Sequence, residues 1–143
     1  MNAKPSPVPD AITQAYWERL REGRLSFQLC GSCQTPWLPA SPICPRCWSA
    51  AHQTVDSSGR ARLVTWVTYH RAYHPAFSDR IPYVVGLVEL EEGPRLMAGI
   101  QTDDPESLRV GARLELAVES REGGYRVPEF APGSGEREDE NAD

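Results

Sequence analysis

The four cysteines are the residues of this sequence with the clearest chemistry. Cys30, Cys33, Cys44 and Cys47 form two Cys-x-x-Cys pairs, and residues 34–43 separate the pairs. Each pair turns back on itself, so two facing turns place four thiolates around one Zn²⁺ at about 2.3 Å. The spacing therefore predicts a structural zinc ribbon with one zinc per chain. Because sulfur fills all four positions, none stays open for water or substrate, which argues against zinc catalysis.

Three other uses are known for cysteines in such pairs. A pair of disulfides suits a secreted domain, but residues 1–14 lack the apolar stretch of a signal peptide. A thioredoxin-like redox pair requires a Cys-x-x-Cys that opens a helix after a strand, and neither pair does so. Iron bound as in rubredoxin uses the same four ligands. Iron and a disulfide pair therefore stay open as alternatives to zinc.

The residues around the cysteines also bear on the site. Pro42 and Pro45 restrict the backbone of the second turn, where Arg46 can offset the negative charge of a zinc–tetrathiolate centre. Trp37 and Trp48 lie beside the metal turns, in a module too small to bury them. They are candidates for contact with a partner or for stacking on a ligand. The alternative is that they cover the metal site against the next domain.

The charge of the chain is unevenly distributed. The formal net charge is −5 over 143 residues, and −4 of it lies after residue 135. The remainder is near neutral, which argues against nonspecific nucleic-acid binding through a basic face. No apolar run approaches the roughly 20 residues that a transmembrane helix needs. With metal-bound thiols in a reducing compartment, we expect a cytoplasmic protein with neither nucleic acid nor membrane as a partner.

One helix is predicted before the cysteines. Apolar residues recur at helical spacing over Ala11–Glu22, with Asp10 placed to cap the start and Gly23 to end the helix. Tyr16 and Trp17 give this helix a large apolar face. The face either packs on its own chain or docks on a partner.

Most of the remaining chain is predicted to be strand. Leu25–Leu29 alternates and leads into Cys30, as the first strand of the ribbon would, and residues 50–59 form a polar linker or crossing segment. Five further strands follow, at Arg62–His70, Tyr83–Leu90, Arg95–Gln101, Arg113–Glu119 and Tyr125–Phe130. With a helical turn at residues 103–108, they meet the requirements of a five-stranded OB-fold barrel. Gly86 is interpreted as a bend or bulge in the second of these strands.

The predicted fold is thus mostly β, with an N-terminal helix, a zinc ribbon and a C-terminal five-stranded OB-fold barrel. The predicted divisions are a disordered leader at 1–9, the helix at 10–24, the ribbon at 25–50, the OB-fold at 51–130 and a disordered acidic tail at 131–143.

With its elements in this order, the chain resembles a family long catalogued as a domain of unknown function. That family joins an N-terminal helix, a rubredoxin-like zinc ribbon and a C-terminal OB-fold, and it is found with acyl-CoA enzymes. The matching pieces are Tyr16–Leu25, the four cysteines with Pro36 and Pro45, Gly59–Trp66, His70 with Pro75 and Phe77, Ile81–Leu90, and Val110 with Gly111. The family usually has glycine after the second and fourth cysteines, where this chain has Gln34 and Trp48, so we expect a somewhat strained metal site.

The resemblance implies a non-catalytic accessory subunit within a hetero-oligomer. Its partner would be a thiolase-like enzyme, such as a thiolase or a retro-aldolase acting on steroid or other bulky acyl-CoA, or a hotdog-fold enoyl-CoA hydratase. The acyl-CoA would lie in a channel shared between the subunits. The sequence agrees, since it has no cysteine outside the metal site and no serine in a Gly-x-Ser-x-Gly setting. A nucleophile would have to come from the partner.

Residues 70–83 form the most site-like stretch of the predicted barrel, because long loops often carry function. Its candidates for binding acyl-CoA or the partner are Arg71 and Arg80 for phosphates, Tyr73, Phe77 and Tyr83 for an acyl chain, fused ring or adenine, and His74. The alternative is an exposed loop whose aromatic residues pack on the ribbon. Two other functions are weighed, a nucleic-acid-binding module and an independent enzyme, and the neutral body and acidic tail count against the first.

Overall fold

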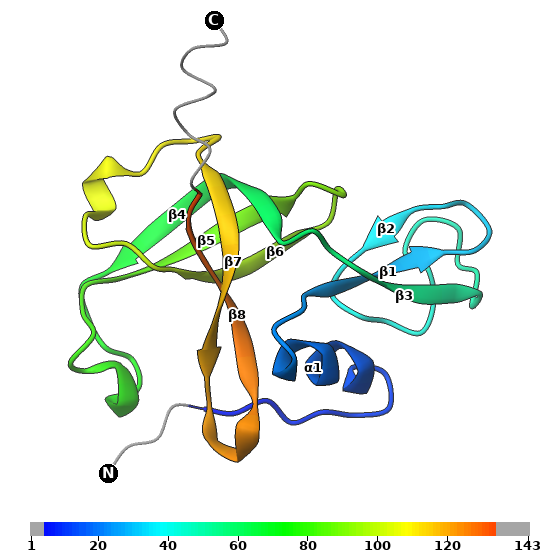
Figure 1. Ribbon diagram of the computed structural model, residues 1–143, viewed down its shortest axis with the longest axis horizontal. Helices are drawn as coiled ribbons and strands as arrows, with labels where there is room; N and C mark the ends of the chain where they lie inside the picture. Colours follow the sequence, from blue (N-terminus) through cyan, green and yellow to red (C-terminus); the bar gives the residue numbers. More distant parts are fainter. Residues whose placement is uncertain (1–4, 134–143) are drawn as a thin grey trace, which may run out of the picture.

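The computed structural model describes residues 5–133, in which one helix lies between two separate β-sheets (Figure 1). The elements of the ribbon half are α1 (Gln14–Arg21), β1 (Ser26–Cys30), β2 (Pro36–Trp37) and β3 (His52–Asp56). Those of the barrel half are β4 (Arg60–Tyr69), η1 (Pro75–Phe77), β5 (Tyr83–Leu90), β6 (Arg95–Ile100), η2 (Pro105–Ser107), β7 (Arg113–Ser120), η3 (Glu122–Gly124) and β8 (Arg126–Pro132). No helix within residues 5–133 is long and apolar enough to span a membrane.

The barrel has the strand order of an OB-fold. Its strands lie in the order β4-β5-β6-β8-β7, and β7 pairs with β4 to close it. The 3-10 turn η2 lies between the third and fourth barrel strands, where the helical turn is predicted. The mostly-β fold with an N-terminal helix and a five-stranded barrel is therefore confirmed. The last strand continues to Pro132, beyond its predicted end, and residues 134–143 of the predicted tail lie outside the described residues.

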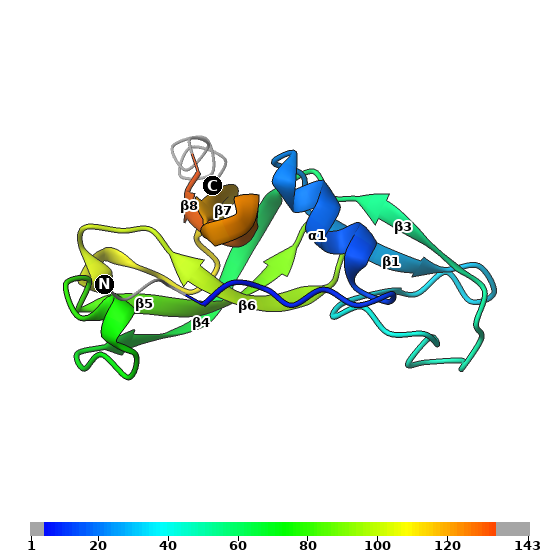
Figure 2. The same cartoon turned by 90° about the horizontal axis from the view of Figure 1, so that it is seen from below.

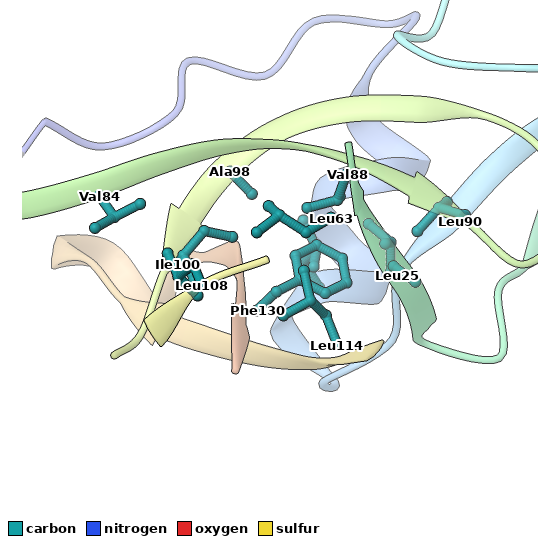
Figure 3. Packing of buried hydrophobic residues seen from close by; sticks show 12 residues of the cluster. Leu25, Leu63, Val84, Val88, Leu90, Ala98, Ile100, Leu108, Leu114 and Phe130 are labelled. Carbon is teal, nitrogen blue, oxygen red and sulfur yellow. The ribbon is translucent and has the colours of Figure 1, made fainter. Parts of the chain in front are cut away.

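Alternation along the strands builds the core of the barrel. Along β5, every second residue from Val84 to Leu90 is buried. Phe130 of β8 is fully buried and lies among Leu63, Val88 and Leu114 (Figure 3). Burial of each such side chain stabilises the fold by about 1.5–3 kcal/mol. The core thus joins residues that are far apart in the sequence.

Gly86 is required by packing inside the barrel, which corrects its interpretation as a bend in its own strand. A Cβ atom at this position would lie 2.9 Å from side-chain carbons of both Ile100 and Leu63. β5 runs through Gly86 with an unbroken register to β6, and the irregularity lies instead in the pairing of β4, between Leu63 and Thr65. Glycine therefore lets two opposing core side chains approach the strand.

The helix begins at Gln14 and ends at Arg21, so it is shorter than predicted at both ends. A turn occupies residues 11–13, where the helix was predicted to begin. The carboxylate of Asp10 accepts hydrogen bonds from the backbone N–H groups of Ile12 and Thr13, at 2.9 and 2.8 Å. At the other end Gly23 has φ +81°, and the N–H groups of Gly23 and Arg24 donate to carbonyls of the last helical turn. This arrangement is a Schellman motif, for which glycine is the preferred residue.

Two segments of the structure differ from the predicted divisions. β3 pairs with β1 along its whole length, so the ribbon sheet extends to Asp56 and residues 52–56 belong neither to a linker nor to the barrel. Residues 5–9, predicted as disordered leader, lack regular structure but contact the barrel. The carbonyl of Pro5 accepts a hydrogen bond from Arg121 at 2.9 Å, and the hydroxyl of Ser6 donates to the Glu122 carbonyl at 3.2 Å.

The helix α1 ties the two halves together, and both views place it between them (Figures 1 and 2). Leu20 of α1 and Leu25, just before β1, are buried in the core of the barrel. On the ribbon side, Asp56 at the end of β3 forms ion pairs with Arg19 at 3.0 Å and Arg24 at 2.5 Å. The metal-binding loops therefore lie at the end of the ribbon away from the barrel.

Candidate functional site

The four cysteines converge as a metal-binding cluster. All four sulfur atoms lie within 4.8 Å of one another, with 3.5 Å between Cys30 and Cys47 and 3.6 Å between Cys33 and Cys44. A tetrahedral zinc with bonds of about 2.3 Å requires S···S edges of about 3.8 Å. A disulfide requires about 2.05 Å. The donors thus fit one four-coordinate ion and not two disulfides.

Backbone geometry prepares these sulfurs for a metal. The sulfur of Cys30 accepts hydrogen bonds from the N–H groups of Ser32 and Cys33, at 3.3 and 3.4 Å, and Cys44 receives an equivalent pair in the second turn. The N–H of Cys33 is the main reason that the pKa of the Cys30 thiol is lowered. Hydrogen bonds from the side chain and backbone of Thr35 lower the pKa of Cys33 to about 6. A backbone hydrogen bond at Ser49 lowers the pKa of Cys47, but contacts with the other cysteines, led by Cys30, outweigh it and raise this pKa to about 12. Zinc binds the thiolate form, so loading all four sulfurs releases protons.

The residue after each Cys-x-x-Cys pair has a left-handed backbone. Gln34 has φ +62° and Trp48 has φ +67°, a region that favours glycine. These are the two positions where the chain departs from the glycines of the family that it resembles. The backbone strain expected in the metal loops therefore lies at Gln34 and Trp48.

The two tryptophans beside the metal have opposite environments. Trp37 is 5% exposed, packs against Cys30 and Cys44, and donates a hydrogen bond from Nε1 to the Ser41 hydroxyl at 3.0 Å. Of the two predicted roles, this burial favours the one in which Trp37 covers the metal site. Trp48 is 76% exposed. Arg46, beside it, is exposed as well.

An aromatic cluster joins residues 70–82 to the barrel. The rings of Tyr69 and Tyr83 stack with centroids 4.9 Å apart, and Phe77 lies 5.5 Å from Tyr83. Tyr73 meets the edge of the Tyr69 ring at 6.1 Å and is 73% exposed. His74 lies 6.0 Å from Phe77. The loop thus packs on the barrel strands and not on the ribbon, and it leaves Tyr73 open.

The polar candidates of the loop differ in availability. The guanidinium of Arg80 forms an ion pair with Glu119 at 2.5 Å, and Arg121 binds the same carboxylate. Arg80 thus anchors the loop, which disfavours its predicted use on phosphates. Nδ1 of His74 accepts a hydrogen bond from the N–H of Ala76 at 3.0 Å and so caps η1. Arg71 lies 5.4 Å from the centre of the Tyr73 ring and is exposed.

The outer surface of β4, β5 and β6 forms an apolar face that the sequence analysis missed. Registers place Val67 beside Val85, and Leu87 beside Met97, on the side opposite to the buried residues. We define the barrel face as Val67, Tyr69, Tyr83, Val85, Leu87 and Met97. Val67 is 57% and Met97 70% exposed. The missed signal is that, apart from Glu89, β5 is apolar at both alternating sets of positions, as in a strand covered on both sides.

A second missed feature is an apolar groove next to this face. It has a volume of about 560 Å³ and lies between α1, residues 38–40 and the strands β6 and β8. Tyr16 and Trp17 line it and also pack against the core, so the apolar face of the helix serves its own chain. Burial raises the pKa of Tyr16 to about 12. The groove could not be read from one segment because three distant segments form it.

Two family models match the chain. The rubredoxin-like zinc ribbon domain of ChsH2 matches residues 17–53, and the C-terminal OB-fold domain of ChsH2 matches residues 54–119. With this match and the fit of the four sulfurs, the ribbon is a site for one structural zinc.

Relatives and solved structures agree. A DUF35 domain-containing scaffold protein of Pyrococcus furiosus is 35% identical over 72% of this chain and 75% of its own length. A probable enoyl-CoA hydratase alpha subunit of Thermomonospora curvata is 32% identical over 90% of this chain, which spans 40% of that protein. A chain of the Ltp2-ChsH2(DUF35) aldolase structure superposes with a TM-score of 0.79 and 31% identity, covering 89% of this chain and 98% of that one. The chain belongs to the DUF35 family.

Proposed function

We propose that this chain is a non-catalytic accessory subunit that binds an acyl-CoA enzyme through its barrel face. The observation that carries the proposal is an apolar sheet surface with Val67 and Met97 more than half exposed. Monomeric proteins rarely expose contiguous apolar patches of this kind, and they mark interaction sites. A second protein would cover this surface as a second layer covers a sheet.

The class of partner is suggested by the related proteins. One related structure combines Ltp2 with ChsH2(DUF35) in an aldolase, and one relative is named as a hydratase alpha subunit. The proposed partner is therefore a thiolase-like aldolase or thiolase, or an enoyl-CoA hydratase, working in the cytoplasm. Steroid or other bulky acyl-CoA is the proposed substrate of the complex.

The chain's own residues suit binding better than bond cleavage. All of its cysteines belong to the metal cluster, and His74 already caps η1. Tyr73 and Arg71, exposed at one end of the barrel face, are the proposed contacts to the acyl-CoA at the edge of a shared channel. Trp48 and Arg46 are the proposed contacts of the ribbon with the partner.

Co-purification from the native host tests the proposal. The untagged chain should elute with an acyl-CoA lyase, transferase or hydratase subunit, and about one zinc per chain should accompany it. A Val67→Glu, Met97→Glu double variant should lose the partner but keep its zinc and its unfolding temperature. Recovery of nucleic acid in place of an enzyme, or a monomer that alters no acyl-CoA enzyme, would refute the proposal.

A further inference from the structure

The barrel has a short open seam between β6 and β8. These strands run parallel, and their pairing comprises only Gly99 with Glu129 and Ile100 with Phe130. The N–H of Gln101, just after β6, donates to the carbonyl of Phe130 at 2.8 Å. Because the direction of the backbone groups alternates along a strand, the N–H and C=O groups of the odd-numbered β6 residues also face β8. Met97 is the next odd-numbered residue beyond the paired region.

Pro128 explains why the pairing ends at Gly99. In a parallel ladder of this register, the N–H of residue 128 would donate to the carbonyl of Met97. Proline has no N–H, so this rung cannot form. The Met97 carbonyl is thus a backbone acceptor without a β8 donor, at a strand edge.

This open edge borders the apolar groove. Met97 lines the groove and is 70% exposed, while Tyr16 and Trp17 of α1 contribute to the opposite wall. Arg95 is the only charged residue of the lining. A groove of about 560 Å³ is within the range of sites that enclose small ligands or a few residues of extended chain.

The chain's own ends do not suit this groove. Gly133, the last described residue, donates its N–H to the carbonyl of Arg113 on β7. The ten residues after it contain five acidic side chains and a single apolar one, Ala142. At the other end, Pro5 is bound to Arg121, and only Met1 and Ala3 of the four preceding residues are apolar. The composition of these residues favours an occupant from another polypeptide.

We propose that an extended segment of the partner enzyme adds to β6 in this groove and hydrogen-bonds to the backbone of Met97. This mode is β-strand addition, in which backbone groups supply affinity and neighbouring pockets supply selectivity. The segment is apolar, because Arg95, the single charged residue of the lining, is already paired with Glu89 at 2.9 Å. The inference rests on the proposed function, because the groove shares Val85 and Met97 with the barrel face.

A pair of variants at one position separates backbone from side chain. An added strand would use both outward backbone groups of Met97, the carbonyl and the N–H. Met97→Pro keeps the carbonyl and removes the N–H, and the ladder to β5 survives because the even-numbered residues of β6 make it. Met97→Ala keeps both backbone groups and removes the exposed side chain. Against the co-purified partner enzyme, Met97→Pro should weaken binding about tenfold and Met97→Ala about threefold or less. Zinc content and unfolding temperature of both variants serve as controls for folding.

Amide exchange of the wild-type chain gives a readout that does not depend on substitution. Exchange of the Met97 amide should slow in the complex and stay fast in the free chain. If the partner still co-purifies but this exchange and the affinity of Met97→Pro are unchanged, strand addition is refuted and the accessory function stands. Protection that appears on self-association without a partner would overturn the inference in favour of a second copy. If no partner co-purifies, the proposed function fails first.

Discussion

The ribbon and the barrel are stabilised in different ways. The buried cluster of the ribbon consists of Cys30, Cys44 and Trp37, whereas the barrel cluster has twelve buried residues drawn from α1, all five barrel strands and two connecting segments. A core as small as that of the ribbon contributes little, so metal binding must supply most of its folding free energy. One chain thus combines a metal-dependent module and a metal-independent one, joined by α1.

Removal of a buried zinc ligand tests this division with the largest expected effect. Cys44→Ser should abolish stoichiometric zinc binding, whose free energy in zinc-finger peptides is about 10–16 kcal/mol at pH 7. Amide exchange should then accelerate over β1, β2 and β3 and stay slow in the barrel strands. Ser49→Ala, which alters the second turn without removing a ligand, is the control. Loss of protection in both halves would contradict the independence of the barrel.

Truncation of the barrel core should give the opposite pattern. Phe130 is fully buried, and Phe130→Ala should destabilise the barrel by about 3–5 kcal/mol through lost burial and a cavity. Denaturant unfolding measures this loss, and zinc content should stay near one per chain. Val110→Ala, at a residue that is 75% exposed, should change stability little. Zinc loss together with barrel unfolding would show that the two halves are coupled.

The two left-handed residues allow the metal loops to be compared with each other. Gln34→Gly and Trp48→Gly should each relieve about 1 kcal/mol of backbone strain. Resistance to a zinc chelator should therefore rise in both variants. Only Trp48→Gly should weaken binding to the partner enzyme, because only this variant removes an exposed indole ring. Equal partner affinity of the two variants would remove Trp48 from the interface.

The smallest effect concerns the turn that precedes α1. Hydrogen bonds from the backbone and hydroxyl of Thr13 lower the pKa of the Asp10 carboxyl. Because the pKa is lower in the folded state, the ionised carboxyl of Asp10 stabilises the folded chain. This stabilisation is complete above the ordinary pKa of aspartate and is lost as the pH falls through the pKa of the folded state. Asp10→Ala should slightly lower the unfolding temperature at neutral pH and have no effect at low pH. Asp10→Asn, which keeps an acceptor, should fall between wild type and Asp10→Ala.

The sequence predicted what depends on neighbours along the chain. Two Cys-x-x-Cys turns identify the metal ligands because both sulfurs of each turn come from residues three apart. Gly23 ends the helix because a single backbone conformation requires glycine there. The five barrel strands follow from alternation within each segment, which reports the burial of one face without reference to the partner strand.

The tertiary structure decided everything that depends on residues far apart. The sequence predicted that Arg80 is available for phosphate, but Glu119 of β7, 39 positions away, forms an ion pair with it. The sequence also allowed an exposed Trp37, but this ring packs against the cysteines of the metal loops. The role of β3 depended on its pairing with β1, and Pro128 opens a seam only in the register that sets it against Met97. Spacing along the chain fixes local geometry, but contacts between distant segments are selected by packing of the whole fold. The sequence therefore determined the metal site, and the tertiary structure alone formed the surfaces on which we expect a partner to bind.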